Sequence, residues 1–269
     1  MNSIFHRKTL IIGAVLFSLG AFALVANATH SWGGYHWART SNPFTLKLGN
    51  NTSGTWTGLL NTVSSDWSAS TLLDTSVIAS GKNPKTCRPT LGRDEICNAN
   101  YGNTGWLGVA SVWIYSDGHI AQGTVKNNDY YFGSSTYPYN NEAEKLHVIC
   151  QEIGHTLGLD HQSTDGFSLD TCMDYYHNTS DSDTRSTLPN AHDYEELGII
   201  YGGHTDVSNS YTTASASNRG FSGLAQSGDF EKASEWGKSL KQDNHGRDSL
   251  FERDLGKGNK IFTFVIWAD

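Results

Sequence analysis

The sequence has no excess of basic residues. Its 19 Lys and Arg are outnumbered by 27 Asp and Glu, which gives a formal net charge of −8. Nucleic acids and anionic membrane surfaces bind clusters of positive charge. We therefore expect no nucleic-acid partner, and the acidic excess indicates a soluble protein. Charged residues make up only 17% of the chain and aromatic residues 12%, a balance typical of exported proteins rich in strands and ordered loops.

Long hydrophobic runs are missing after the first 28 residues. The one such run, Leu10 to Val25, follows the basic stretch His6-Arg7-Lys8 and precedes Ala26-Asn27-Ala28, a small-x-small cleavage site. This pattern predicts a secretory signal peptide over residues 1–28. The alternative is a retained membrane anchor, because the run is close to the shortest spanning helix. We expect a mature chain that starts near Thr29, is secreted to the periplasm or the cell exterior, and has no membrane contact after cleavage.

Cysteine is scarce, with four residues in the chain. An even number in an exported protein favours disulfides over free buried thiols, and four cysteines can pair in three ways. Proximity in sequence favours Cys87 with Cys97, which leaves Cys150 with Cys172. The second pair would lie beside the motif described below.

The hydrophobic pattern changes between the two-residue period of strands and the spacing of helices. Strands are predicted at 44–48, 72–79, 106–115 and 119–125, and helices at 56–70, 140–158 and 188–201. The stretch 82–105 is predicted to be a loop that the first cysteine pair holds in order. Over residues 29–203 this order predicts an α/β (α+β) domain, with a twisted mixed sheet backed by two long helices.

The composition changes after Gly203. Residues 204–228 are rich in Ser, Thr, Asn and Gly, as in a linker. Two alternating stretches then flank Gly256-Lys257-Gly258-Asn259, which predicts a small β-hairpin region within residues 229–269.

One short stretch carries chemistry. It reads CQEIGHTLGLDH, residues 150–161. On a helix, residues four apart share a face, so Gln151 and His155 would point to one place. Glu152 is offset enough to reach a water molecule there. Gly158 would let the chain turn, so that His161 returns as a third ligand of a catalytic zinc ion with an open position.

This stretch resembles the signature HExxHxxGxxH of the metzincin clan of zinc endopeptidases, with Gln151 in place of the first His. Met173 resembles the Met-turn of the clan, which lies beneath the metal. Residues 188–202 resemble the closing helix of matrixins, and the likeness extends over roughly residues 35–203. It implies a metzincin-like fold with a five-stranded sheet, zinc as cofactor and Glu152 as general base. It also implies a substrate cleft beside an edge strand, which we assign to His119–Val125.

The Gln151 amide oxygen can bind a divalent cation but should be a weaker zinc ligand than imidazole. His147 lies one helical turn earlier, about 5.4 Å away, too far to replace it without distortion. Tyr175 is better placed, because in the astacin and serralysin branches a Tyr two residues after the Met-turn Met ligates zinc or steadies the reaction intermediate. A buried Tyr with a hydrogen-bonded hydroxyl is the alternative.

We therefore expect a secreted, monomeric zinc endopeptidase that acts on protein or peptide substrates. The alternative is a catalytically inactive metzincin-like domain that serves as a binding or structural protein. Another possibility is that His155 and His161 are ordinary histidines at a helix end. A carbohydrate-binding surface formed by Trp32, Tyr35 and Trp37 is a further class, although such aromatic residues usually pack into a core.

Matrixins usually carry a pro-segment whose cysteine blocks the metal. Here only a short stretch separates Ala28 from the first predicted strand, which leaves no room for one. Two expectations follow. Either activity is not restrained in this way, or the C-terminal hairpin region restrains it.

Overall fold

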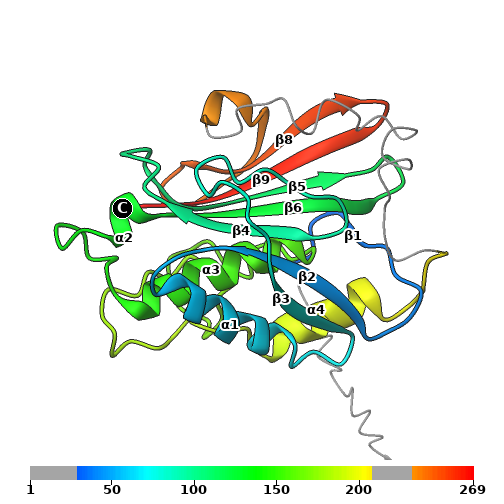
Figure 1. Ribbon diagram of the computed structural model, residues 1–269, viewed down its shortest axis with the longest axis horizontal. Helices are drawn as coiled ribbons and strands as arrows, with labels where there is room; N and C mark the ends of the chain where they lie inside the picture. Colours follow the sequence, from blue (N-terminus) through cyan, green and yellow to red (C-terminus); the bar gives the residue numbers. More distant parts are fainter. Residues whose placement is uncertain (1–28, 208–231) are drawn as a thin grey trace, which may run out of the picture.

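The computed structural model describes residues 29–207 and 232–269. The predicted signal peptide and most of the predicted linker lie outside these residues. Within them, the chain folds as a mixed α+β protein around one nine-stranded sheet (Figure 1). No helix in the described ranges is both long enough and apolar enough to cross a membrane.

The sheet is parallel on one side and antiparallel on the other. Its strands are β1 (His36–Trp37), β2 (Phe44–Asn51), β3 (Leu73–Ala79), β4 (Asp94–Ala99), β5 (Trp106–Ile114), β6 (His119–Asn128), β7 (Lys238–Gln242), β8 (Asp248–Gly256) and β9 (Asn259–Trp267). Their order across the sheet is β3-β2-β4-β6-β5-β9-β8-β7, and β1 pairs with the start of β6. Strands β2, β3, β4 and β6 are parallel, whereas β5 runs antiparallel to both β6 and β9.

Three helices lie on one side of the sheet: α1 (Trp56–Trp67), α3 (Glu142–Thr156) and α4 (Ala191–Tyr201) (Figure 1). The short helices α2 (Asp129–Phe132) and η1 (Ala233–Glu235) complete the described elements. Asparagine fixes the start of two helices: the Asn141 side chain accepts the Glu144 backbone N–H, and Asn190 forms a capping box with Asp193. The predicted helices are thus confirmed, and each packs its apolar face on the sheet or on a neighbouring helix.

Strand β4 corrects the prediction that residues 82–105 are a loop. It lies between β2 and β6, and it was missed because it begins with the charged residues Asp94 and Glu95. Both side chains are fully buried, and Glu95 pairs with Arg93 and accepts a hydrogen bond from Ser80. These polar partners offset the cost of burying the Glu95 carboxylate. The pattern of apolar residues alone predicts that such a charged residue lies at the surface.

The edge of the sheet also differs from the prediction. Strand β6, assigned as the edge, lies inside the sheet between β4 and β5. The predicted hairpin forms as β8 and β9, but it continues the same sheet, because β9 pairs along β5 from Trp106↔Trp267 to Ile114↔Lys260. The five-stranded sheet is therefore extended to nine strands. A hairpin pattern fixes how two strands pair with each other, but not what pairs with their outer edges.

Both predicted disulfides are present, Cys87 with Cys97 and Cys150 with Cys172. The second joins α3 to the segment that contains Met173.

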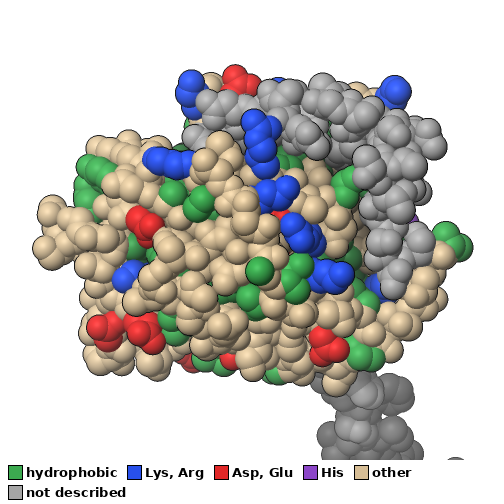
Figure 2. All heavy atoms as spheres, viewed as in Figure 1, with side chains coloured by type: hydrophobic (Ala, Val, Ile, Leu, Met, Phe, Trp, Pro, Cys, Tyr) green, Lys and Arg blue, Asp and Glu red, His purple; other side chains and the backbone are tan. Residues whose placement is uncertain are grey.

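The aromatic residues near the N-terminus pack inward. Trp32 and Trp37 are 5% and 4% exposed, so they belong to the core and not to a carbohydrate-binding surface. On the face seen in Figure 2, charged side chains cover a small part of the surface, and several Lys and Arg side chains follow one another down its middle.

Candidate metal centre

The C-terminal end of α3 and the turn after it bring two imidazole rings together. His155 Nε2 lies 3.1 Å from His161 Nε2. The turn depends on Gly158, whose φ of +100° favours glycine and where a β-carbon would lie 2.5 Å from the Tyr35 carbonyl oxygen. The predicted approach of His161 to His155 is therefore present.

The outer nitrogen of the His155 ring is already occupied. His155 Nδ1 lies 2.8 Å from the Leu159 carbonyl oxygen, so it donates its proton there and the Nε2 lone pair faces His161. Histidines that bind metals are usually oriented in this way. Burial lowers the pKa of both rings, and the neighbouring His161 lowers the pKa of His155 further. Both imidazoles are therefore held in the neutral form that binds metals.

Gln151 is oriented by the segment after the disulfide. Its Nε2 donates to the carbonyl oxygens of Cys172 and Asp174, at 3.0 and 2.6 Å. Its Oε1 is buried and has no hydrogen-bond partner among the described residues. The amide oxygen thus remains available as a ligand. His147 does not replace it, because its Nε2 lies 2.9 Å from the Asp174 carbonyl oxygen.

Glu152 lies beneath strand β5. Gly108 makes room for it, since a β-carbon at that position would lie 2.7 Å from Glu152 Oε1. Burial raises the pKa of Glu152 well above its usual range, and the backbone N–H groups of Ala110 and Ile266 offset part of this effect. Both Glu152 carboxylate oxygens are buried and have no hydrogen-bond partner of normal geometry among the described residues.

Met173 and Tyr175 flank the paired rings. Met173 is fully buried under α3, where a β-carbon at Gly154 would clash with its sulfur atom. The ring of Tyr175 stands edge-on to His161, with centroids 4.6 Å apart. Its hydroxyl donates to the Val265 carbonyl oxygen. The alternative of a hydrogen-bonded, buried Tyr is thus the arrangement seen here, next to the histidine that the sequence predicts as a ligand.

Strand β9 covers this centre. Phe264 packs its ring flat on His155, and it also contacts Trp32. Phe262, Phe264 and Ile266 all belong to the main core on the helix side of the sheet. As a result His155 is fully buried and His161 only 9% exposed. The sequence predicted the hairpin, but the alternation within 261–267 gave no sign that its inner face would lie on the motif.

Two hollows mark where the hairpin meets the rest of the molecule. One, of about 330 Å³, lies between Trp32, Asp160 and Lys241, and Lys241 forms an ion pair with Asp160. The other, of about 310 Å³, lies between Tyr175 and Arg247. Both open beside the covered centre.

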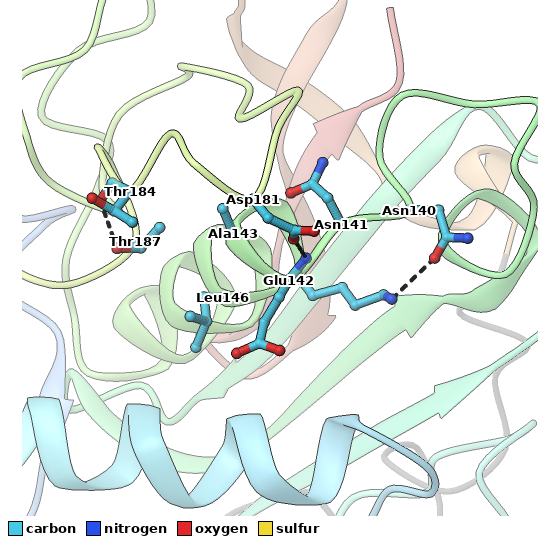
Figure 3. Close-up of a pocket in the computed structure, with 9 residues that line it drawn as sticks. Asn140, Asn141, Glu142, Ala143, Leu146, Asp181, Thr184 and Thr187 are labelled. Carbon is cyan, nitrogen blue, oxygen red and sulfur yellow. Dashed lines mark hydrogen bonds between the residues drawn. The ribbon is translucent and has the colours of Figure 1, made fainter.

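A larger hollow lies elsewhere, at the start of α3 (Figure 3). It measures about 500 Å³, and in it Asp181 accepts the backbone N–H of Glu142 at 2.5 Å while Lys145 donates to Asn140. These contacts cap the first turn of α3, and the residues that line this hollow include none of the predicted catalytic or metal-binding residues.

The donor types of this candidate centre are those found in zinc sites. His155 and His161 offer facing nitrogens, Gln151 offers a buried oxygen without a partner, and borderline-soft zinc accepts both donor types. Apart from this centre, three groups in the described chain could hold a metal: His30 with His192 and Glu196, His36 with His204 and Asp206, and Glu144 with His147 and His177. The sequence pattern did not predict these three groups, because their members lie far apart in the chain and share no fixed spacing.

The sequence matches no model of a protein family, and a comparison with curated proteins found no match either.

Proposed function

We propose that this protein is an exported zinc endopeptidase of the metzincin type whose active site is covered by its own strand β9. One observation carries this proposal: His155 and His161 face each other through Nε2, with Glu152 buried on the same helix. The two disulfides and the signal-like residues 1–28 support export.

His155, His161 and Gln151 would hold the zinc ion. When bound, zinc polarises a peptide carbonyl and acidifies a water molecule. Glu152 would take the proton of that water and pass it to the leaving amine. Met173 supports the helix from below, and Tyr175 stands where its hydroxyl can contact the reacting carbonyl once it no longer donates to Val265.

Substrate access requires that β9 leaves its place. Peptides commonly bind proteases as an added strand on a sheet edge, and the free edge of β5 would be such a place. Strand β9 takes all of that edge, and Phe264 occupies the space above His155. The expectation that the hairpin region restrains activity therefore has geometric support, and it becomes part of the proposal.

A catalytically inactive metzincin-like domain is the second candidate. The burial of strand β9 supports this candidate. Its side chains Phe262, Phe264 and Ile266 are 4%, 0% and 0% exposed and form a regular part of the core. Removing this strand from the sheet costs much free energy, because the burial of each such side chain stabilises the fold by about 1.5–3 kcal/mol.

Metal content and cleavage distinguish the two. Full-length protein carrying a specific protease site within residues 208–231 is purified, cut at that site or left uncut, and assayed for zinc and for cleavage of casein and a peptide library. The enzyme proposal expects one tightly bound zinc at this centre and cleavage after the cut, lost in Glu152→Gln. Zinc without cleavage in the cut protein, also after mild denaturant has released the hairpin, would establish the inactive domain.

A further inference from the structure

A second group of histidines lies at the end of the sheet where β1 joins β6. His36 belongs to β1, His119 begins β6, and His204 and Asp206 follow α4. They come from three parts of the chain and share no residue with the centre on α3. We propose that His36, His204 and Asp206 bind a structural zinc ion, with His119 held against the same carboxylate, a site that does not depend on the proposed peptidase activity.

The ligand atoms are close enough for one ion. His36 Nε2 lies 3.0 Å from His204 Nε2 and 4.0 Å from Asp206 Oδ2. On the other side of the same carboxylate, His119 Nε2 lies 3.0 Å from Asp206 Oδ1. Ligands at about 2.0–2.1 Å from a tetrahedral zinc ion are about 3.3 Å from each other. The observed distances between ligand atoms are slightly shorter or longer than this value. Small side-chain rotations would therefore bring the ligand atoms to equal distances from one ion.

The outer nitrogen of the His36 ring is held in the manner of a metal ligand. His36 Nδ1 lies 2.9 Å from the Gly34 carbonyl oxygen, and His119 Nδ1 lies 3.1 Å from Asp117 Oδ1. The His36 ring therefore has an acceptor for its Nδ1 proton, which turns its Nε2 toward His204 and Asp206, whereas the His119–Asp117 contact does not have hydrogen-bond geometry. A carbonyl or carboxylate behind the ring is the usual second partner of a zinc-bound histidine.

Arg39 orients the remaining ligands. Its Nη1 lies 3.1 Å from Asp206 Oδ2, and its Nη2 donates to the His204 carbonyl oxygen at 2.7 Å. The Asp206 Oδ1 oxygen thus stays directed at His119, away from the guanidinium. Arg39 itself is fully buried, so this support is rigid.

The competing explanation is a hydrogen-bonded network without metal. In that network the His36 Nδ1 proton is used on Gly34, so His204 Nε2 must donate to His36 Nε2. One tautomer each of His36 and His204 satisfies this pair, and no ion is needed. The two explanations differ in zinc content and in the effect of zinc on stability.

Zinc content is measured in full-length protein after zinc loading and exhaustive dialysis, for wild type, His204→Ala, Asp206→Asn, His155→Ala and the double variant His155→Ala/His204→Ala. We expect His204→Ala and Asp206→Asn each to lose one equivalent, whether or not His155 is changed. Cobalt(II) should give tetrahedral visible absorption in wild type and in His155→Ala, but not in the double variant.

The matched control is His245→Ala, which removes another exposed histidine outside the cluster and should leave zinc content unchanged. Zinc added to metal-free protein should raise the melting temperature of His155→Ala and not that of the double variant. Equal zinc content in wild type, His204→Ala and Asp206→Asn would overturn the proposal and leave the hydrogen-bonded network. If the centre on α3 holds no zinc, wild type has one equivalent and His204→Ala none, so the two proposals fail separately.

Discussion

Phe264 of β9 stacks on His155 of α3, with ring centroids 4.0 Å apart and an angle of 11° between the rings. The imidazole that the motif predicts as a zinc ligand is thus packed like a core aromatic residue. Its Nε2 still faces His161, so the stacked ring can bind a metal at its edge while its face stays covered. This contact links the metal centre to the hairpin.

Replacing Phe264 should uncover the centre. Phe264→Ala removes the ring above His155 and should increase cleavage of a fluorogenic peptide at least tenfold if β9 restrains an active enzyme. The matched control is Ile261→Ala on the same strand, because Ile261 faces the opposite side of the sheet with Trp113 and Tyr115. Equal activity of both variants and wild type would contradict restraint by Phe264. We expect Phe264→Ala also to lower the free energy of unfolding by about 3–5 kcal/mol.

Position 151 tests the ligand set. Gln151→His should raise zinc affinity at least tenfold, because imidazole is the better donor, and tenfold corresponds to about 1.4 kcal/mol. Gln151→Leu keeps the size and removes both the oxygen and the donor to Cys172 and Asp174, and it should weaken binding. Competition with a chromogenic chelator measures both changes. Unchanged affinity in both variants would place residue 151 outside the metal site.

The Cys150–Cys172 disulfide connects α3 to the Met173 segment. Replacing both residues by Ala should lower the free energy of unfolding by about 3 kcal/mol, as for a loop of this length. If the bond also holds Gln151 against the Cys172 carbonyl, zinc affinity should fall as well. Removing Cys87–Cys97 is the control, which should cost stability without changing zinc affinity. Chelator competition that gives equal affinity for all three proteins would limit the disulfide to stability alone.

Asp94 should make stability depend on pH. Its Oδ2 lies 2.6 Å from Thr156 Oγ1, which lies 2.7 Å from the Ile153 carbonyl oxygen. The Thr156 hydroxyl donates to Asp94 Oδ2, while the other oxygen of this carboxyl is buried without a hydrogen-bond partner among the described residues. Burial, the main cause, and the nearby Glu95 charge raise the pKa of Asp94 from 3.8 to about 8, against a smaller opposite effect of Thr156.

The native state therefore keeps a proton that the unfolded chain loses above a pH of about 4. This contribution to stability is complete below pH about 4 and is lost as pH rises toward 8, with a slope of at most about 1.4 kcal/mol per pH unit. Asp94→Asn, whose amide oxygen can still accept the Thr156 hydroxyl, should flatten the slope in urea unfolding. Asp74→Asn, at an exposed position, should keep it. A slope that is equal in wild type and Asp94→Asn would show that Asp94 is ionised in the native protein.

Local sequence patterns predicted much of this molecule. The helix through the motif, the turn at Gly158 and both disulfides depend on residues close together in the chain, and all are present. What could not be predicted depends on distant pairing. The alternation in β9 shows two apolar faces, but only the fold determines that one of them lies on His155.

The histidines of the second cluster illustrate the same limit. His36 and His119 come together because β1 pairs with β6 in the register His36↔His119. Strand β1 has two residues, too few for any periodic pattern. His204 and Asp206 reach them only through the position of α4. No spacing rule joins these residues in the sequence.

The place of β9 in the sheet also affects how the chain folds. Strand β9 is synthesised after all the other described strands, yet it lies in the middle of the antiparallel half, between β5 and β8. Until it arrives, the outer edge of β5 has unpaired N–H and C=O groups beside an apolar face, and such an edge readily pairs with another chain. The nascent protein is therefore most prone to aggregate just before β9 is added, and a chain that ends before β9 should depend strongly on chaperones.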